Sequence, residues 1–153
     1  MLEKFFNFIL FRFSKLSRAA KKILADIESE LTEEFVELLL NTMSLYFRIN
    51  KEFRKNIKGF EGRYLFRSRN GNITLSAVFY KGKMKVSEEE TEDPHVTVIF
   101  KNAQSLWNYI LSPKPDILGS LLKQEVVPDG NLNYLYKFAY MANHLRLKLP
   151  DLV

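Results

Sequence analysis

The stretch RYLFRSRNGNITLSAVFYKGKMKVS, residues 63–87, decides the fold because its apolar residues recur at every second position. Asn70-Gly71 is a strong signal for a type I′ hairpin turn, and Lys81-Gly82 marks a second turn. The stretch therefore predicts three successive antiparallel strands, over 63–69, 72–80 and 83–87. One face of the last two strands is apolar, and it carries Ile73, Leu75, Ala77, Phe79, Met84 and Val86.

Two further strands complete the predicted sheet. Residues 96–101 alternate in the same way, after an acidic loop over 88–94 that we expect to be solvated. Residues 123–127 predict a short fifth strand that ends at the run from Pro128 to Gly130. The strands are expected to form an antiparallel meander. Helices are expected to cover the face that bears Ile73, Leu75, Phe79 and Phe100.

The remaining segments have helical periodicity. Residues 2–31 place their apolar side chains on a single stripe, which predicts an amphipathic helix. Thr32 is the expected N-cap of a second helix that runs to Gly59, with a bend at Asn50. The helices expected further along are two short ones, Asn102 to Leu111 and Asp116 to Leu122, and a long one over 131–149. Together with the sheet, these helices predict an α+β domain.

The long helix over 131–149 has more apolar surface than contact with one sheet requires. Its polar positions Asn133, Lys137 and His144 form one narrow stripe. A helix on a sheet needs an apolar stripe only a little over ~100° wide, and here apolar residues cover roughly half of the circumference or more. We therefore expect a second partner, which is another helix, a bound hydrophobic molecule or a membrane.

Composition bounds the class of protein. A chain of 153 residues is long enough for one domain with a sizeable core. The absence of cysteine excludes disulfides, zinc–thiolate sites and cysteine nucleophiles, and two histidines leave little material for a metal site. The net charge of +5 resides in residues 1–22, and the remainder of the chain is neutral. A basic body that wraps nucleic acid is therefore not expected.

The basic, phenylalanine-rich N-terminus has two interpretations. It is too short for a transmembrane helix and fits a signal peptide poorly, so we expect a cytoplasmic protein. The helix either docks on its own domain or a second protomer, or lies in the plane of a membrane as a peripheral anchor at its inner face. The residues expected to contact the membrane are Phe5, Phe6, Phe8, Phe11, Arg12 and Lys15.

Catalytic signatures are absent from the sequence. It contains no Gly-x-Ser-x-Gly elbow, phosphate-binding loop or dinucleotide fingerprint. His95 follows an acidic cluster without the spacing of a metal motif, and His144 is interpreted as surface polarity near a helix C-terminus. The arginines that alternate with aromatic residues over 63–69 are explained by an outward strand face rather than by RNA binding. We expect no enzyme activity, no cofactor, no metal and no nucleic-acid partner.

From about residue 57 to 145, the order of elements resembles the sterol carrier protein 2 (SCP2) domain family. The matching features are an aromatic first strand after Ile57-Lys58-Gly59, the Gly82-Lys83 hairpin, the strand from His95 to Val98, the helix start at Pro115-Asp116, and Gly130-Asn131 before the last helix. The resemblance implies a twisted, largely antiparallel five-stranded sheet whose helices cover one face and enclose an apolar tunnel. The long leader is similar to that of small bacterial carriers that assist ubiquinone synthesis.

The resemblance implies two parts, a helical leader over 1–45 and a lipid-binding domain over 46–149. It also implies non-catalytic binding or transfer of a sterol-like, quinone, isoprenoid or fatty-acyl molecule. Each buried CH₂ group of such a ligand contributes about 0.8 kcal/mol, so apolar walls are sufficient for binding. The expected walls are Phe79, Phe100, Trp107, Ile110, Leu121, Leu122, Leu135, Phe138, Ala139, Met141 and Ala142. The alternative is a filled core in an interaction module that forms a homodimer or joins an enzyme complex.

Overall fold

The computed structural model describes residues 30–102, 105–106, 109 and 117–148. The expected helix over 2–31 therefore lies almost entirely outside the described residues. The described helices are α3 (Glu30–Ile49), α4 (Lys51–Arg54), the 3₁₀ helix η1 (Lys55–Ile57), α6 (Ile117–Leu122) and α7 (Leu132–Lys148). None of them is long and apolar enough to cross a membrane.

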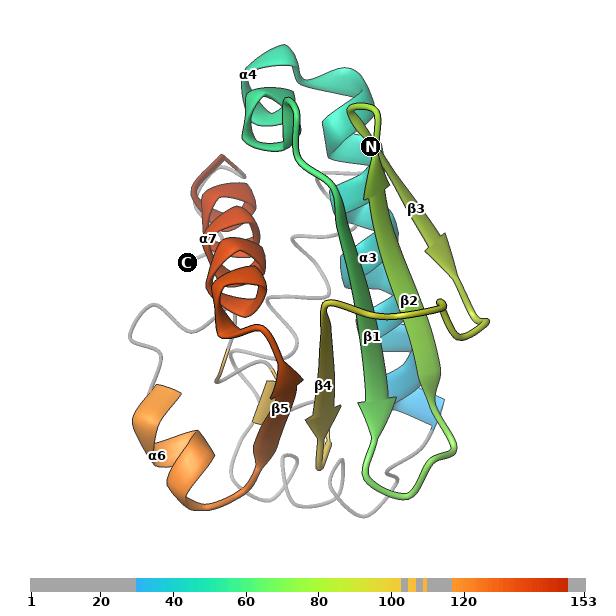
Figure 1. Ribbon diagram of the computed structural model, residues 1–153, viewed down its shortest axis with the longest axis vertical. Helices are drawn as coiled ribbons and strands as arrows, with labels where there is room; N and C mark the ends of the chain where they lie inside the picture. Colours follow the sequence, from blue (N-terminus) through green and yellow to red (C-terminus); the bar gives the residue numbers. More distant parts are fainter. Residues whose placement is uncertain (1–29, 103–104, 107–108, 110–116, 149–153) are drawn as a thin grey trace.

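The five strands form one sheet in the order β3-β2-β1-β4-β5 (Figure 1). They are β1 (Gly62–Ser68), β2 (Thr74–Tyr80), β3 (Lys83–Ser87), β4 (Val96–Phe100) and β5 (Val126–Gly130). The β1–β2, β2–β3 and β4–β5 pairs are antiparallel, whereas β1 and β4 are parallel. A largely antiparallel five-stranded sheet is confirmed. The meander is correct for the first three strands and wrong for β4, which lies beside β1.

The acidic loop between β3 and β4 accounts for the position of β4. It passes in front of β2 and β1, on the face of the sheet opposite α3 (Figure 1). Arg67 forms an ion pair with Glu90, and the Arg63 Nε donates to the carbonyl oxygen of Asp93 over 2.9 Å. Leu65, between the two arginines, is only 4% exposed. The loop is solvated, as predicted, since five of its seven residues over 88–94 are exposed, and it is also held across the sheet.

Strand β5 continues through the residues that were expected to end it. Pro128 pairs with Val98 inside the antiparallel β4–β5 ladder, and the strand extends to Gly130. Proline is tolerated here because β5 is an edge strand, which has a neighbour on only one side. The predicted strand was too short because proline, which has no N–H, ordinarily ends a central strand, and the sequence does not show that β5 lies at an edge.

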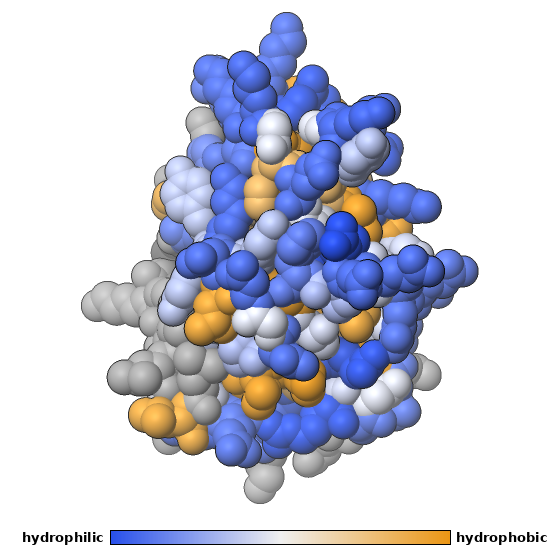
Figure 2. All heavy atoms as spheres, viewed as in Figure 1, coloured by the Kyte–Doolittle hydropathy of each residue, from blue (hydrophilic) through white to orange (hydrophobic). Residues whose placement is uncertain are grey.

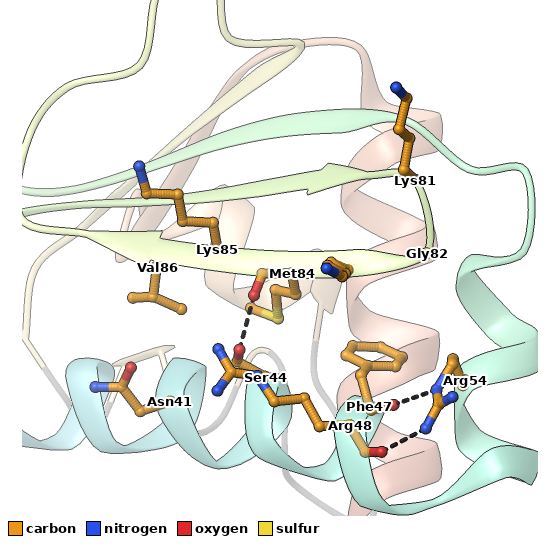
Figure 3. Close-up of a pocket in the computed structure, with 11 residues that line it drawn as sticks. Asn41, Ser44, Phe47, Arg48, Arg54, Lys81, Gly82, Met84, Lys85 and Val86 are labelled. Carbon is orange, nitrogen blue, oxygen red and sulfur yellow. Dashed lines mark hydrogen bonds between the residues drawn. The ribbon is translucent and has the colours of Figure 1, made fainter.

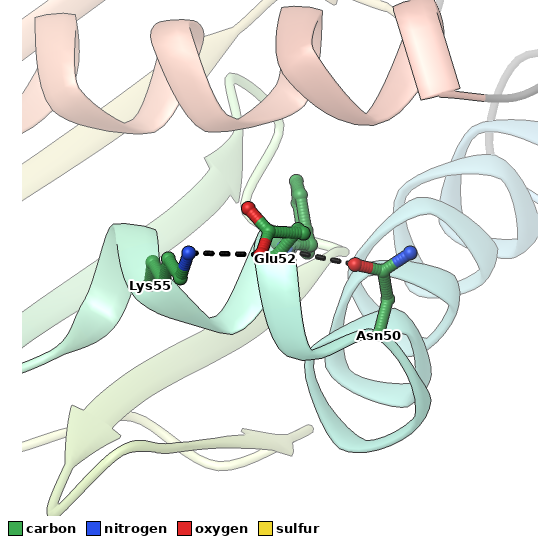
Figure 4. A network of polar contacts seen from close by, with 4 residues as sticks. Asn50, Glu52 and Lys55 are labelled. Atoms are coloured by element: carbon green, nitrogen blue, oxygen red, sulfur yellow. Dashed lines mark hydrogen bonds and ion pairs between the residues drawn. The ribbon is translucent and has the colours of Figure 1, made fainter.

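The long N-terminal helical region breaks at Asn50, as predicted. The Asn50 side chain accepts a hydrogen bond from the Phe53 N–H over 2.9 Å and so caps α4. Glu52 and Lys55 form an ion pair across the next turn at 2.8 Å (Figure 4). Thr32 is not an N-cap, since it lies inside α3, which already includes Glu30.

Helices α3 and α7 pack on the same face of the sheet. The Ser44 hydroxyl of α3 donates to the Met84 carbonyl oxygen of β3 over 2.7 Å. On the other side, the Tyr64 hydroxyl of β1 donates to the Tyr134 carbonyl oxygen of α7 over 2.8 Å. The face that bears Ile73, Leu75, Phe79 and Phe100 is therefore the helix-covered one, as predicted, and these four side chains are buried.

One apolar core joins the two helices to the sheet. Helix α3 supplies Val36, Leu39, Leu40, Met43 and Phe47 to this core, and α7 supplies Leu135, Phe138, Met141, Ala142 and Leu145. Residue 45, the expected boundary between leader and domain, lies inside α3, between core residues Met43 and Phe47. The division into 1–45 and 46–149 remains a prediction.

Candidate functional site

Six of the expected ligand-binding residues are buried in the core that joins α3, α7 and the sheet. Phe79 and Phe100 of the sheet and Leu135, Phe138, Met141 and Ala142 of α7 are all buried in the one core. Ala139 is half-buried, whereas Leu122 is 75% exposed at the end of α6. Trp107 and Ile110, together with the side chain of Leu121, lie outside the described residues, as do all the expected membrane-contact residues Phe5, Phe6, Phe8, Phe11, Arg12 and Lys15.

Aromatic rings form the centre of this region. The ring of Phe138 lies 5.3 Å from that of Tyr64 and 5.0 Å from that of Phe66, measured between centroids. Tyr64 also contacts Phe79 edge to face at 5.5 Å. Sequence reasoning did not assign Tyr64 and Phe66 to the site. Their alternation with Arg63 and Arg67 was the available signal, because it places them on the opposite, helix-covered face.

Tyr64 brings a hydroxyl group to this aromatic centre. Its O–H is satisfied by the carbonyl oxygen of Tyr134 at the start of α7. Burial raises the pKa of the Tyr64 phenol far above its ordinary value of 10.0, and the neighbouring Tyr134 raises it further. The hydroxyl group is therefore neutral, and its proton is used in the hydrogen bond that positions α7 rather than being available to a ligand.

Tyr109 is a second buried phenol next to α7. It is part of the core, and burial raises its pKa to about 12, with a further contribution from nearby Tyr136. Leu106 of the same segment is also buried in the core. Residues 106 and 109 therefore belong to the same core as the inner face of α7.

His95 is half-buried at the end of the acidic loop, where it contacts β1 and the start of α7. Its Nδ1 accepts from the Arg63 N–H over 3.0 Å, and its own N–H donates to the Arg63 carbonyl oxygen over 2.8 Å. Its ring stacks on Tyr134 at 4.2 Å, and its carbonyl oxygen accepts from the Asn131 N–H. Burial lowers the pKa of His95, and the Arg63 charge lowers it further. No group of His, Cys, Asp or Glu that could hold a metal occurs among the described residues.

Two residues of the polar stripe predicted for α7, His144 and Lys137, contact other parts of the protein rather than facing only solvent. His144 Nδ1 lies 2.8 Å from the Asn56 amide nitrogen, and its ring is 5.4 Å from that of Phe53. Lys137 places its ammonium group 5.4 Å from the centroid of the Phe60 ring. His144 is therefore more than a polar residue on the surface, because it joins α7 to the α4–η1 segment.

Tyrosines form much of the outward surface of α7. Tyr136 and Tyr140 are 54% and 59% exposed, and Leu132 and Leu147 are also exposed near the two ends of the helix. Tyrosine suits such a position because its ring is apolar and its hydroxyl can remain in water. The helix thus buries one face on the sheet and presents a second, mostly aromatic face.

A groove between α3 and β3 was not predicted. Its volume is about 750 Å³, and we call it the α3–β3 groove. Its walls are Asn41, Ser44, Phe47, Arg48, Arg54, Lys81, Gly82, Lys83, Met84, Lys85 and Val86 (Figure 3). The available signal was the alternation of Lys81, Lys83 and Lys85 around Gly82 and Met84, which predicts a basic strand edge.

Comparison with known proteins identifies the fold. No family model matches the sequence, and no curated protein matches it. Among solved structures, a UbiJ-SCP2 ubiquinone synthesis protein is 22% identical, with 74% of this chain and 95% of that chain covered and a TM-score of 0.54. The sterol carrier protein domain 2 of Helicoverpa armigera is 17% identical over 76% of this chain and 93% of that one, also with a TM-score of 0.54.

A segment of a larger protein is also similar. The inverting sec-alkylsulfatase Pisa1 from Pseudomonas sp. is 15% identical over 57% of this chain, with a TM-score of 0.50, and the match spans 14% of the sulfatase chain. The likeness to the two domain-sized structures extends over nearly their whole length. The strand order, the single helix-covered face and these likenesses lead to one conclusion: the chain has an SCP2-like fold.

Proposed function

We propose that this protein binds and transfers a hydrophobic lipid between α7 and the sheet. The observation that carries the proposal is the unbroken apolar layer that Phe79, Phe100, Phe138, Met141 and Ala142 form within an SCP2-like fold. A ligand would enter this layer by replacing contacts between side chains of similar polarity. Each of its CH₂ groups would contribute about 0.8 kcal/mol.

The ligand class follows from the chemistry of this layer. The described walls are aromatic and aliphatic, and the Tyr64 hydroxyl is already committed to Tyr134. Such walls favour a sterol-like, quinone, isoprenoid or fatty-acyl molecule over a polar metabolite. A polyprenyl quinone belongs to this class, and one protein of similar fold is named for ubiquinone synthesis.

The N-terminal residues supply the proposed route to a membrane. Residues 1–22 are basic and rich in phenylalanine, a composition that suits an anionic headgroup interface. Contact through Phe5, Phe6, Phe8, Phe11, Arg12 and Lys15 would bring the domain to the surface from which its ligand leaves. The protein would then be cytoplasmic and peripheral at the inner face of the membrane.

The direct test is lipid extraction and mass spectrometry of the purified full chain. A co-purifying lipid at near-equal molar amount, or saturable uptake of a fluorescent acyl probe, is the expected result. An empty chain in native mass spectrometry that also takes up no probe would refute lipid binding. Deletion of residues 1–22 should abolish liposome association while the ligand remains bound.

The exposed face of α7 favours a second candidate function. Tyr136 and Tyr140, with Leu132 and Leu147, form a surface suited to another helix. On this alternative the core stays filled, and the protein is an accessory subunit or a dimer. Light scattering of the Tyr136→Ser/Tyr140→Ser variant decides between the two. A change of oligomeric state without loss of bound lipid would show that association and lipid binding coexist, whereas an empty chain that dissociates would favour the alternative.

A further inference from the structure

The α3–β3 groove shares no residue with α7, although its floor belongs to the same core, where the Phe47 ring lies 5.9 Å from that of Phe79. Helix α3 forms one wall, and the edge strand β3 forms the other. Met84 and Val86 point toward α3, where Phe47 faces them, so the floor is apolar (Figure 3). Its volume of about 750 Å³ is within the range of sites for small ligands.

Three carbonyl groups at this groove accept hydrogen bonds from side chains. Ser44 Oγ donates to the Met84 carbonyl oxygen over 2.7 Å. The Arg54 guanidinium donates to the carbonyl oxygens of Phe47 and Arg48, which belong to the last turn of α3. These bonds offset the partial negative charge of a helix C-terminus, which would otherwise repel an anion. These three carbonyl oxygens are therefore less available to repel an anionic ligand.

The lining contains five basic residues and no acidic one. Within the described chain the two ion pairs are Lys55–Glu52 and Arg67–Glu90, so Arg48, Lys81, Lys83 and Lys85 have no carboxylate partner there. Arg48 lies along α3 beside Ser44, whereas Lys81 and Lys85 extend from the opposite side of β3 (Figure 3). The guanidinium thus lies in the groove, and the lysines form a flexible basic rim.

Apolar side chains are exposed on the same end of the molecule. Ile49, next to Arg48, is 65% exposed, and Tyr80, next to Lys81, is 53% exposed. The end that contains α4 and the β2–β3 turn is otherwise covered mainly by hydrophilic side chains (Figure 2). Cations interleaved with an exposed aromatic and an aliphatic side chain are typical of a surface that meets lipid headgroups.

We propose that the α3–β3 groove binds the anionic phosphate group of a membrane lipid, with Arg48 as its main contact and the lysines of the β2–β3 hairpin as its basic rim. Charge complementarity selects the occupant, because the groove has unpaired cations, capped acceptors and an apolar floor that can accept the first carbons of an acyl chain. An arginine guanidinium also matches the geometry of phosphate oxygens. The described lining of this site includes no residue of α7, so the proposal does not require a lipid in the layer under α7.

The test is a titration of the full, isotope-labelled chain with soluble dihexanoyl phosphatidic acid, followed by NMR. Parallel titrations use dihexanoyl phosphatidylcholine, inorganic phosphate and a tetraglutamate peptide. The groove variant is Arg48→Gln/Lys83→Gln. The matched control is Lys101→Gln/Lys123→Gln, which removes the same charge from exposed positions outside the groove.

Saturable shifts of amides in 41–48 and 81–86 with phosphatidic acid are expected. The groove variant should weaken this binding about ten-fold or more, and the control should not. Equal binding of inorganic phosphate would support the anion site but assign it to free phosphate. Equal binding of phosphatidylcholine, tighter binding of the peptide, equal loss in the control, or no saturable shift would each overturn the proposal. Lipid extraction of the groove variant separates this proposal from the proposed function, because lipid bound under α7 should still co-purify when the groove no longer binds phosphatidic acid.

Discussion

Tyr64 of the central strand and Tyr134 of α7 are joined by a hydrogen bond of 2.8 Å from a side-chain hydroxyl to a main-chain carbonyl. Replacement of Tyr64 by Phe keeps the ring contacts with Phe138 and removes only this bond. We expect the free energy of unfolding to fall by about 1 kcal/mol at neutral pH. Urea denaturation measures the change, and Tyr140→Phe, at an exposed position of α7, is the control. An unchanged midpoint for Tyr64→Phe would mean that the bond does not hold α7.

Tyr64 and Tyr109 should also make the protein sensitive to alkali. Burial raises the pKa of both phenols in the folded state, that of Tyr109 to about 12, above the ordinary value of 10.0. Their contribution to stability is therefore complete below pH 10 and is lost as the pH rises above it. Tyr64→Phe should lose stability less steeply than the wild type between pH 10 and 11.5. Identical slopes would contradict this assignment.

Gly130 should be the least replaceable glycine that the structure describes. Its φ is +117°, and an added Cβ would lie 2.5 Å from the His95 carbonyl oxygen, which is main chain and cannot rotate away. Gly130→Ala should lower the free energy of unfolding by more than about 3 kcal/mol. Gly82→Ala is the matched control, because φ there is +70° but the added Cβ meets open space. It should cost about 1 kcal/mol, and equal effects would refute the steric argument.

His95 should control acid stability. Its pKa is lowered in the folded state, first by burial and then by Arg63, so the unfolded chain binds the proton more readily. The contribution of His95 is complete above about pH 6.5 and is lost as the pH falls toward the lowered folded value. His95→Asn keeps an acceptor for the Arg63 N–H and should flatten this acid limb. His144→Gln retains His95, so its stability should still fall with decreasing pH as in the wild type. The same flattening of the acid limb in both variants would contradict the assignment.

Local patterns were sufficient for much of the fold. The alternation and turns of residues 63–87 predicted β1, β2 and β3 to within two residues, because both signals depend on near neighbours. The place of β4 beside β1 could not be predicted, since it depends on contacts that Arg63 and Arg67 make with Glu90, Asp93 and His95, which lie 23 to 32 residues away. Strand order in turn explains why β5 tolerates Pro128, because β5 is an edge strand.

For the candidate site, too, local sequence patterns predicted one part and missed the contacts between distant segments. The period of 3.6 residues predicted that Leu135, Phe138, Met141 and Ala142 share a buried face. It could not predict that His144 would contact the α4–η1 segment or that Lys137 would lie over the Phe60 ring, because polar residues on a helix are ordinarily assigned to solvent. The α3–β3 groove was beyond prediction for another reason. Its two walls come from α3 and β3, some 40 residues apart, and the net charge of the body is zero.

Ala142 offers a test of the proposed lipid layer that leaves the outer surface unchanged. It is fully buried on the inner face of α7, so Ala142→Phe adds a ring to the space that a ligand would occupy. Overpacking should cost about 1–3 kcal/mol, and retained cooperative unfolding would show that the variant still folds. The lipid that co-purifies per chain should fall by at least half, measured by extraction and mass spectrometry. Tyr136→Phe, on the exposed face of α7, should leave the lipid content unchanged. A folded Ala142→Phe protein with a full complement of lipid would place the ligand elsewhere, because a ligand under α7 cannot share its space with an added ring.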